Sequence, residues 1–344
     1  MPIKLPHSLS LPFLLLHTKP KLPPPRLPFP PRSNTMSTKP YDPIALTGFS
    51  AAASYDAHRP SYIAPALTHL LEQLNVASTP RAKVLDLAAG TGKFTELLAA
   101  RPEEYEIVAV EPHKDMLATL RTKDLKGVSV KEGDAYDIPV EDGWADAVVV
   151  AQQSPRAAGA AVYHSRHSTG THPRFSSSFS LPGSLAPYKT NHRRFANPTS
   201  LASIARTLRP GGRLGLIWNV EDYNQSRHHA TKTHWEGQLR DLNWQHTTDA
   251  SPRYKDNKWA GAFTPPAAFS ALQERIFEVE IWLGKEALWR RLGTLSNIAN
   301  LGEGEREELR KGFDEVLEGE DVQRNDQGEI AVHYIVHTAW ATKL

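Results

Sequence analysis

Apolar residues along the chain follow two alternating spacings. Short apolar runs of the kind found in strands buried on both faces alternate with segments in which apolar residues recur every three or four positions, as in amphipathic helices. This alternation is typical of a doubly wound α/β sheet, where ligands bind at the carboxyl ends of the strands. The pattern predicts strands at residues 83–87, 107–110, 128–131, 147–150 and 213–218, and helices at residues 62–74, 94–100, 115–121 and 201–208.

The first forty residues differ in composition from the rest of the chain. They hold 11 of the 27 prolines, and the first acidic residue is Asp42. Clustered prolines favour extended polyproline conformations over packed helices or strands. We therefore predict a disordered, basic, proline-rich tail over residues 1–40 rather than a targeting segment, with Met36 as an alternative start.

A second unusual segment lies inside the predicted sheet domain. Residues 153–194 contain no Asp or Glu and show neither a strand nor a helix period. A structureless segment of this length is rare inside a compact domain, so we predict a disordered insertion or a translated intron. The predicted organisation is a tail (1–40), the N-terminal part of the α/β domain with the ligand site (41–152), the insertion (153–194), and the C-terminal part with a substrate-side extension (195–344).

Composition and charge exclude several classes of protein. The chain has 344 residues, no Cys and a net charge of +2, which excludes disulfides and thiolate metal sites and argues against nucleic-acid binding through phosphates. No apolar stretch reaches the ~18 residues of a membrane span. We place His228, His229 and His234 on a solvated helix face and predict no metal site. We expect a monomer or homodimer that acts on a small molecule in the cytoplasm in preference to the mitochondrion, without a nucleic-acid or membrane partner.

Three acidic residues mark the ends of three successive predicted strands. Asp86 lies just before a turn that contains Gly90 and Gly92, Glu111 ends the next strand, and Asp134 follows the third. The glycines allow a tight turn and a close approach of the backbone to a ligand. An acid after the second strand is suited to accept hydrogen bonds from ribose hydroxyls. The sequence therefore predicts a nucleoside site at this edge of the sheet.

Two other nucleotide sites fit less well. A phosphate-binding P-loop needs Gly-Lys followed by Ser or Thr, but Phe94 follows Gly92-Lys93. A dinucleotide fingerprint needs a third glycine where Thr95 stands, and Asp86 would crowd a pyrophosphate. We infer a nucleoside ligand that lacks a polyphosphate and carries a cationic group.

These residues resemble the class I S-adenosylmethionine-dependent methyltransferases, in the small-molecule branch that includes ubiquinone-biosynthesis and trans-aconitate types, and fungal members in particular. The resemblance spans residues 49–219 and implies a seven-stranded, mostly parallel Rossmann-like sheet with helices on both faces and a C-terminal α/β extension. It also implies S-adenosyl-L-methionine as cofactor. The cofactor-binding residues that it implies are Asp86, Ala88 (where glycine is commoner), Gly90, Thr91, Gly92, Glu111, Pro112, Met116, Asp134, Ala135 and Gln152, with Tyr55 and Arg59 in a lid segment.

The insertion interrupts the part of the sequence that lines the reaction centre in this family. Ala151-Gln152 is separated from Phe195, and only His192, a weak candidate, lies near the family's histidine position, so no catalytic residue is assigned. An already nucleophilic acceptor such as a carboxylate would need no strong base. The expected activity is methyl transfer to a small molecule by in-line displacement. A nicotinamide-dependent oxidoreductase and an inactive methyltransferase-like binding protein remain as alternatives.

Overall fold

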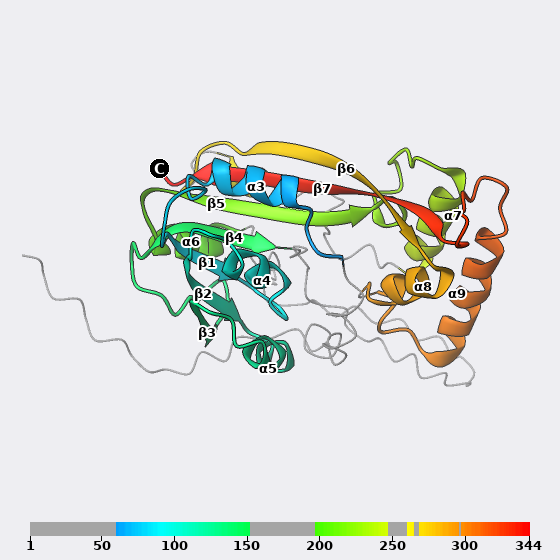
Figure 1. Ribbon diagram of the computed structural model, residues 1–344, viewed down its shortest axis with the longest axis horizontal. Coiled ribbons are helices and arrows are strands. Elements are labelled where there is room, and N and C mark those ends of the chain that lie inside the picture. The colour runs from blue at the N-terminus through cyan, green and yellow to red at the C-terminus, as the bar shows by residue number, and fades with distance from the viewer. Residues whose placement is uncertain (1–59, 152–196, 247–259, 265–267, 296) are drawn as a thin grey trace, which may run out of the picture. The chain divides into compact units, whose positions relative to one another are not determined.

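The computed structural model describes residues 60–151, 197–246, 260–264, 268–295 and 297–344 (Figure 1). These residues all belong to the unit spanning Tyr41–Leu344. The predicted tail over residues 1–40 and insertion over residues 153–194 lie outside the described residues, so the predicted boundaries remain predictions. None of the described helices has the length and apolar character needed to cross a membrane.

The described strands form one seven-stranded sheet in the order β3-β2-β1-β4-β5-β7-β6. The first five strands are parallel, and β7 runs antiparallel to both β5 and β6. The seven-stranded, mostly parallel sheet is therefore confirmed. The strands are β1 (Lys83–Leu87), β2 (Glu106–Glu111), β3 (Val128–Glu132), β4 (Ala145–Ala151), β5 (Leu208–Glu221), β6 (Gln273–Leu283) and β7 (Ile330–Thr342).

Helices cover both faces of the sheet. Successive residues of a strand point to opposite faces, and β1 follows this rule because Leu85 and Leu87 pack in one core while Val84 packs in the other. The first core includes Ile204 of α6, and the second includes residues of α3 and α4. The helices of this part are α3 (Ala64–Gln73), α4 (Lys93–Ala99), α5 (Lys114–Thr122) and α6 (Pro198–Thr207).

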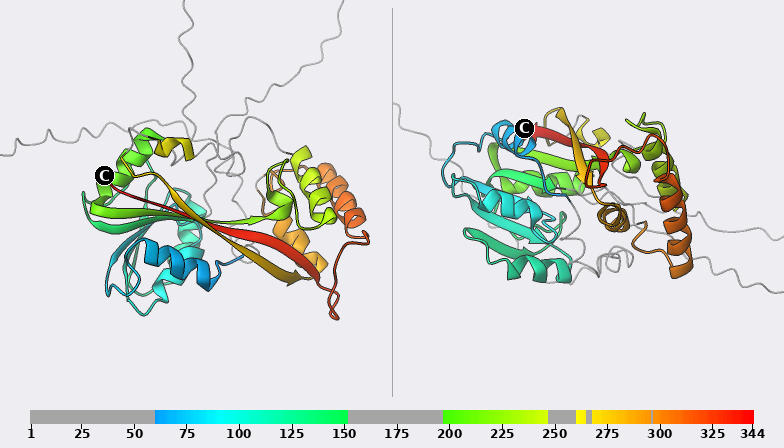
Figure 2. Two further views of the ribbon diagram at one scale, coloured as in Figure 1. Left: turned by 90° about the horizontal axis from the view of Figure 1, so that it is seen from above. Right: turned by 45° about the vertical axis from the view of Figure 1, so that its right-hand side comes forward.

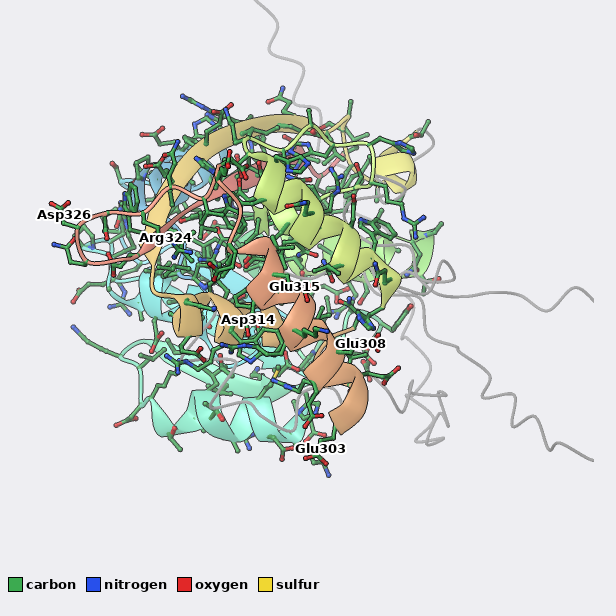
Figure 3. All side chains as sticks on the ribbon, turned by 90° about the vertical axis from the view of Figure 1, so that its right-hand side faces the viewer. Glu303, Glu308, Asp314, Glu315, Arg324 and Asp326 are labelled. Carbon is green, nitrogen blue, oxygen red and sulfur yellow. The ribbon has the colours of Figure 1, made fainter. Side chains whose placement is uncertain are left out.

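A helical cluster stands beyond the carboxyl ends of the parallel strands (Figures 1 and 2). It has its own core, in which Trp235, Leu288 and Phe313 from three different helices pack with Ile330 of β7. Figure 3 views this end, with the acidic side chains of Glu303, Glu308 and Glu315 along α9. The elements of the C-terminal half are η1 (Asp222–Asn224), α7 (His234–Gln245), η3 (Ala260–Phe263), α8 (Lys285–Gly293) and α9 (Glu303–Val316).

A ribbon of three strands joins the parallel sheet to the helical cluster. The last described residue of β4, Ala151, pairs with Ile217, whereas β5 continues to Glu221 with β7 beside it. Along the whole of β6, from Gln273 to Leu283, the partner strand is also β7. The C-terminal extension therefore adds two strands to the main sheet as well as helices beyond it.

The predicted strands and helices of residues 62–218 are confirmed, with one boundary that is wrong. The strand expected at residues 213–218 begins earlier, because β5 already pairs with Ala145 at Leu208 and shifts register before Arg213. Gly211, with φ 72°, allows this irregularity within the strand. The histidine prediction is also wrong in part, because His228 and His229 precede α7 and only His234 lies on it.

Candidate active site

The turn between β1 and α4 is built on left-handed backbone. Ala88, Gly90 and Gly92 have φ values of 61°, 60° and 88°. Left-handed backbone costs a residue with a Cβ about 1–2 kcal/mol, which accounts for the preference for glycine where this chain has Ala88. A Cβ on Gly92 would overlap Cδ1 of Leu120 on α5, and the φ of 88° strains any residue other than glycine at this position. The turn is therefore tightly held between β1 and α5.

Asp86 lies at the end of β1 and is fully buried. Its Oδ2 accepts a 2.6 Å hydrogen bond from the Thr95 hydroxyl, whereas Oδ1 has no hydrogen-bond partner among the described residues. Burial raises the pKa of Asp86 to about 7, the Thr95 hydrogen bond lowers this pKa in part, and the nearby Glu111 raises it. A buried carboxylate with one unpartnered oxygen is suited to a cationic ligand group, which would stabilise its charged form.

Glu111 ends β2 and is buried with both carboxylate oxygens engaged. Oε2 accepts the Gly90 N–H at 2.8 Å, and Oε1 accepts the His113 N–H at 2.8 Å. The side chain thereby ties the turn after β1 to the segment after β2.

Met116, Pro112 and Thr91 complete the wall around this turn. Met116 is buried on α5, and its sulfur lies 3.8 Å from the position that a Cβ on Gly90 would take. Thr91 is buried within the turn, and Pro112 is half-buried between β2 and α5. The structure therefore brings the residues predicted from the first two strand ends into one compact group.

Asp134 follows β3, as expected, but its carboxylate serves its own loop. Oδ1 accepts the N–H groups of Tyr136 and Asp137 at 2.8 and 2.9 Å. The adjacent Gly133 donates its N–H to the Glu111 carbonyl at 3.4 Å, which places this loop beside the end of β2. Ala135 is partly buried and packs against the core that includes Leu85. Asp134 therefore shapes the loop next to the turn.

Four sequence-predicted site residues lie outside the described residues. They are Tyr55, Arg59, Gln152 and His192. Their assignments remain predictions.

Two functional or structural features were missed at the level of sequence. The first is Thr95, which entered the sequence analysis only as the position of a missing third glycine but donates a hydrogen bond to Asp86. The signal that could have indicated this contact is a polar residue on the buried side of α4, beside Phe94 and Leu98. The second is a buried ion pair between Glu221 at the end of β5 and Arg291 on α8, which only the tertiary structure brings together.

The ion pair connects the sheet with the helical cluster. Arg291 Nε lies 3.0 Å from Glu221 Oε1, and the two side chains are 4% and 0% exposed. The guanidinium also stands over the ring of Tyr334 on β7, with its central carbon 5.2 Å from the ring centroid. Three elements thus meet at this charge pair.

Sequence comparison relates this chain to methyltransferases. Residues 84–164 match the family model of a methyltransferase domain. An uncharacterised methyltransferase-like protein of Schizosaccharomyces pombe is 29% identical over 277 residues, 80% of this chain and 88% of that protein. An uncharacterised methyltransferase of Mycobacterium tuberculosis is 33% identical over 180 residues, 52% of this chain and 54% of that protein, so the match spans about half of that relative.

Solved structures resemble the chain more distantly. The YcgJ protein of Bacillus subtilis is 15% identical, with a TM-score of 0.43 over 80% of this chain and 97% of that protein. The strand order and pairing of the chain itself define its fold. The sheet, the glycine-rich turn and these relatives support the assignment of the chain as a class I S-adenosylmethionine-dependent methyltransferase.

Proposed function

We propose that this methyltransferase uses S-adenosyl-L-methionine and transfers its methyl group to a small-molecule acceptor. The observation that carries the proposal is the fully buried Asp86, whose Oδ1 is without a partner among the described residues. S-adenosylmethionine has a sulfonium and an ammonium group, and a cation of this kind offsets the cost of keeping a buried carboxylate charged. The residues present therefore fit this cofactor.

The other residues of the group fit the remaining parts of the cofactor. The Glu111 carboxylate at the end of β2 is suited to accept hydrogen bonds from the two ribose hydroxyls, and the backbone from Ala88 to Gly92 can approach the ligand closely. Met116 and the Asp134-Ala135 loop would border the adenine. By resemblance, Tyr55, Arg59 and Gln152 would cover the methionine end.

When bound, the cofactor supplies a methyl group activated by the sulfonium. The chain's own contribution is to hold this group in line with the acceptor and to exclude water. Alignment of two reactants can lower a barrier by roughly 7–11 kcal/mol. We propose a carboxylate or another nucleophilic atom as acceptor, because methyl transfer to such an atom needs no strong base.

Calorimetric titration of the full chain with S-adenosylmethionine tests the cofactor. We expect binding to the wild type and strongly weakened binding to Asp86→Ala and Glu111→Ala, whereas Asp115→Ala, which removes an exposed carboxylate of α5, should bind as the wild type does. Unchanged affinity in both site variants would overturn the site assignment. Binding of NAD(H) without S-adenosylmethionine would favour the oxidoreductase alternative.

A second comparison tests whether the insertion permits activity. The full chain and a variant without residues 153–194 are titrated with the cofactor and assayed for S-adenosylhomocysteine formation with a panel of small carboxylic acids. Turnover by the full chain supports the proposal. Cofactor binding by both chains with turnover only after deletion would identify the full chain as an inactive, methyltransferase-like binding protein.

A further inference from the structure

We propose that Thr95 is a positioning residue, which fixes the Asp86 carboxylate with Oδ1 turned to the cofactor and favours the charged form of this carboxylate. The inference rests on the proposed function, since it assigns Asp86 to the cationic end of the cofactor. Thr95 lies on α4 and would not need to contact the cofactor itself.

The geometry of Thr95 carries the first step. Thr95 lies in the first turn of α4, three residues after the N-cap Gly92, and its side chain is fully buried. Threonine hydroxyls inside helices commonly donate to a carbonyl of the preceding turn, but this hydroxyl donates to Asp86 Oδ2 at 2.6 Å. A hydroxyl has one hydrogen, so the donor capacity of Thr95 is committed to Asp86.

This bond makes the two oxygens of Asp86 unequal. Oδ2 is occupied by Thr95, and Oδ1 is the buried oxygen left without a partner among the described residues. A carboxylate held at one oxygen cannot turn about its Cβ–Cγ bond without breaking that bond. Thr95 therefore decides which oxygen is presented to a ligand and in which direction.

The surroundings of Asp86 otherwise oppose its charged form. In the sheet, Asp86 pairs with Ala109 of β2 on one side and with Val149 of β4 on the other, both apolar. Glu111 at the end of β2 is the charged residue that affects Asp86, and both it and burial raise the Asp86 pKa. The Thr95 hydroxyl acts in the opposite direction, because its hydrogen bond stabilises the anion. Without this donor, the pKa of Asp86 would lie higher, and a smaller fraction of Asp86 would be ionised near neutral pH to attract a cation.

Two substitutions of Thr95 separate its hydroxyl from its shape. Thr95→Val keeps the volume and branching but removes the donor, whereas Thr95→Ser keeps the donor. The measurement is the dissociation constant of S-adenosylmethionine for the full chain between pH 6 and 9. We expect Thr95→Val to weaken binding near pH 7 by about fivefold for a rise of one unit in the Asp86 pKa and by about tenfold for each further unit, and to recover toward pH 9. Thr95→Ser should follow the wild type.

A matched control is available on the neighbouring helix. Thr119 on α5 donates its hydroxyl to the Asp115 carbonyl at 2.9 Å, so Thr119→Val removes a comparable bond away from the site. This variant should show the wild-type affinity at every pH. If Thr95→Val does not fold, Thr95→Ala, which also lacks the donor, takes its place.

The outcomes distinguish this inference from the proposed function. Wild-type affinity of Thr95→Val at every pH would overturn the role of Thr95 while the cofactor assignment stands. A loss that is equal at every pH would overturn the effect of Thr95 on the charge of Asp86 and leave only its effect on orientation. If the wild-type chain itself does not bind S-adenosylmethionine, the proposed function is wrong and this inference falls with it. A pH-dependent loss restored by serine supports both.

Discussion

Gly90 and Glu111 are 21 residues apart in the sequence, and a 2.8 Å hydrogen bond from the Gly90 N–H to the Glu111 Oε2 joins them. The other oxygen of Glu111 holds the His113 N–H. One side chain thus fixes two loops that arise from neighbouring strands. The site is preorganised by its own backbone donors, which has consequences for stability as well as for binding.

Glu111→Gln should destabilise the fold. An amide has one oxygen, so one of the backbone donors of Gly90 and His113 would lose its acceptor in a buried place, at a cost of about 1–3 kcal/mol. Urea unfolding measures this loss. Glu132→Gln is the control, because Glu132 pairs in register with Glu111 on β3 but is exposed. Equal stability of both variants would contradict the fixing role of Glu111.

Asp86→Asn should make the ligand-free protein more stable at pH 8 while weakening cofactor binding. The folded-state pKa of Asp86, about 7, lies above the ordinary value of 3.8, so the folded chain binds the extra proton between these values. The stability contributed by this group is therefore present below about pH 4 and is lost as the pH rises toward 7. Asparagine avoids this loss, which is on the order of a few kcal/mol.

Unfolding free energies of the wild type and of Asp86→Asn, measured from pH 4 to pH 8, check this prediction. The difference should be small at pH 4 and should grow toward pH 8. A difference that stays constant over the whole range would show that Asp86 does not titrate there.

Ala88→Gly should not destabilise the protein, although glycine normally costs an element about 0.5–1 kcal/mol relative to alanine. At φ 61°, Ala88 carries left-handed strain of about 1–2 kcal/mol, and glycine relieves it. Thermal unfolding compared with Ala118→Gly, at an exposed position of α5, provides the measurement. A loss of stability as large as that of Ala118→Gly would argue against strain at Ala88.

Arg291→Met should cost about 3–5 kcal/mol, because it leaves the buried Glu221 carboxylate without its cation. Arg290→Met, at the exposed neighbouring position, should change little. The double variant Glu221→Gln with Arg291→Met removes both charges and should recover part of the loss. Chemical denaturation of the wild type, Glu221→Gln, Arg291→Met and the double variant gives the coupling free energy, and additive effects would exclude a direct interaction between the two side chains.

The sequence allowed much of the parallel sheet to be predicted, because the apolar runs of β1, β2, β4 and β5 correspond to mostly buried strands, with the half-exposed β3 at the edge of the sheet. Asp86 and Glu111 could be placed at neighbouring strand ends for the same reason. The hydrogen bond between Thr95 and Asp86 could not be predicted, since it depends on how α4 packs on β1. Nor could the use of the Asp134 carboxylate by its own loop, because the spacing that suggests a ligand contact also suits a local turn.

The C-terminal half was predicted only as an α/β extension. In β6, exposed charged residues alternate with half-buried apolar ones, but β6 is held by pairing with β7, whose residues follow two intervening helices. Pairing over such a separation leaves no local signal in the sequence. The same holds for the ion pair of Glu221 with Arg291, which lie 70 residues apart.

The continuous pairing of β5, β7 and β6 also limits how the molecule can move. Domain closure about a hinge needs a few residues whose backbone can rotate freely between two bodies. Here β5 and β7 remain paired without a break, from Arg213 with Thr342 at one end to Glu221 with Tyr334 at the other. This pairing continues past the parallel sheet and into the helical cluster. A rigid-body rotation of the helical cluster relative to the parallel sheet would break these bonds. We therefore expect the two parts to move together, with relative motion confined to twisting of the strands that they share.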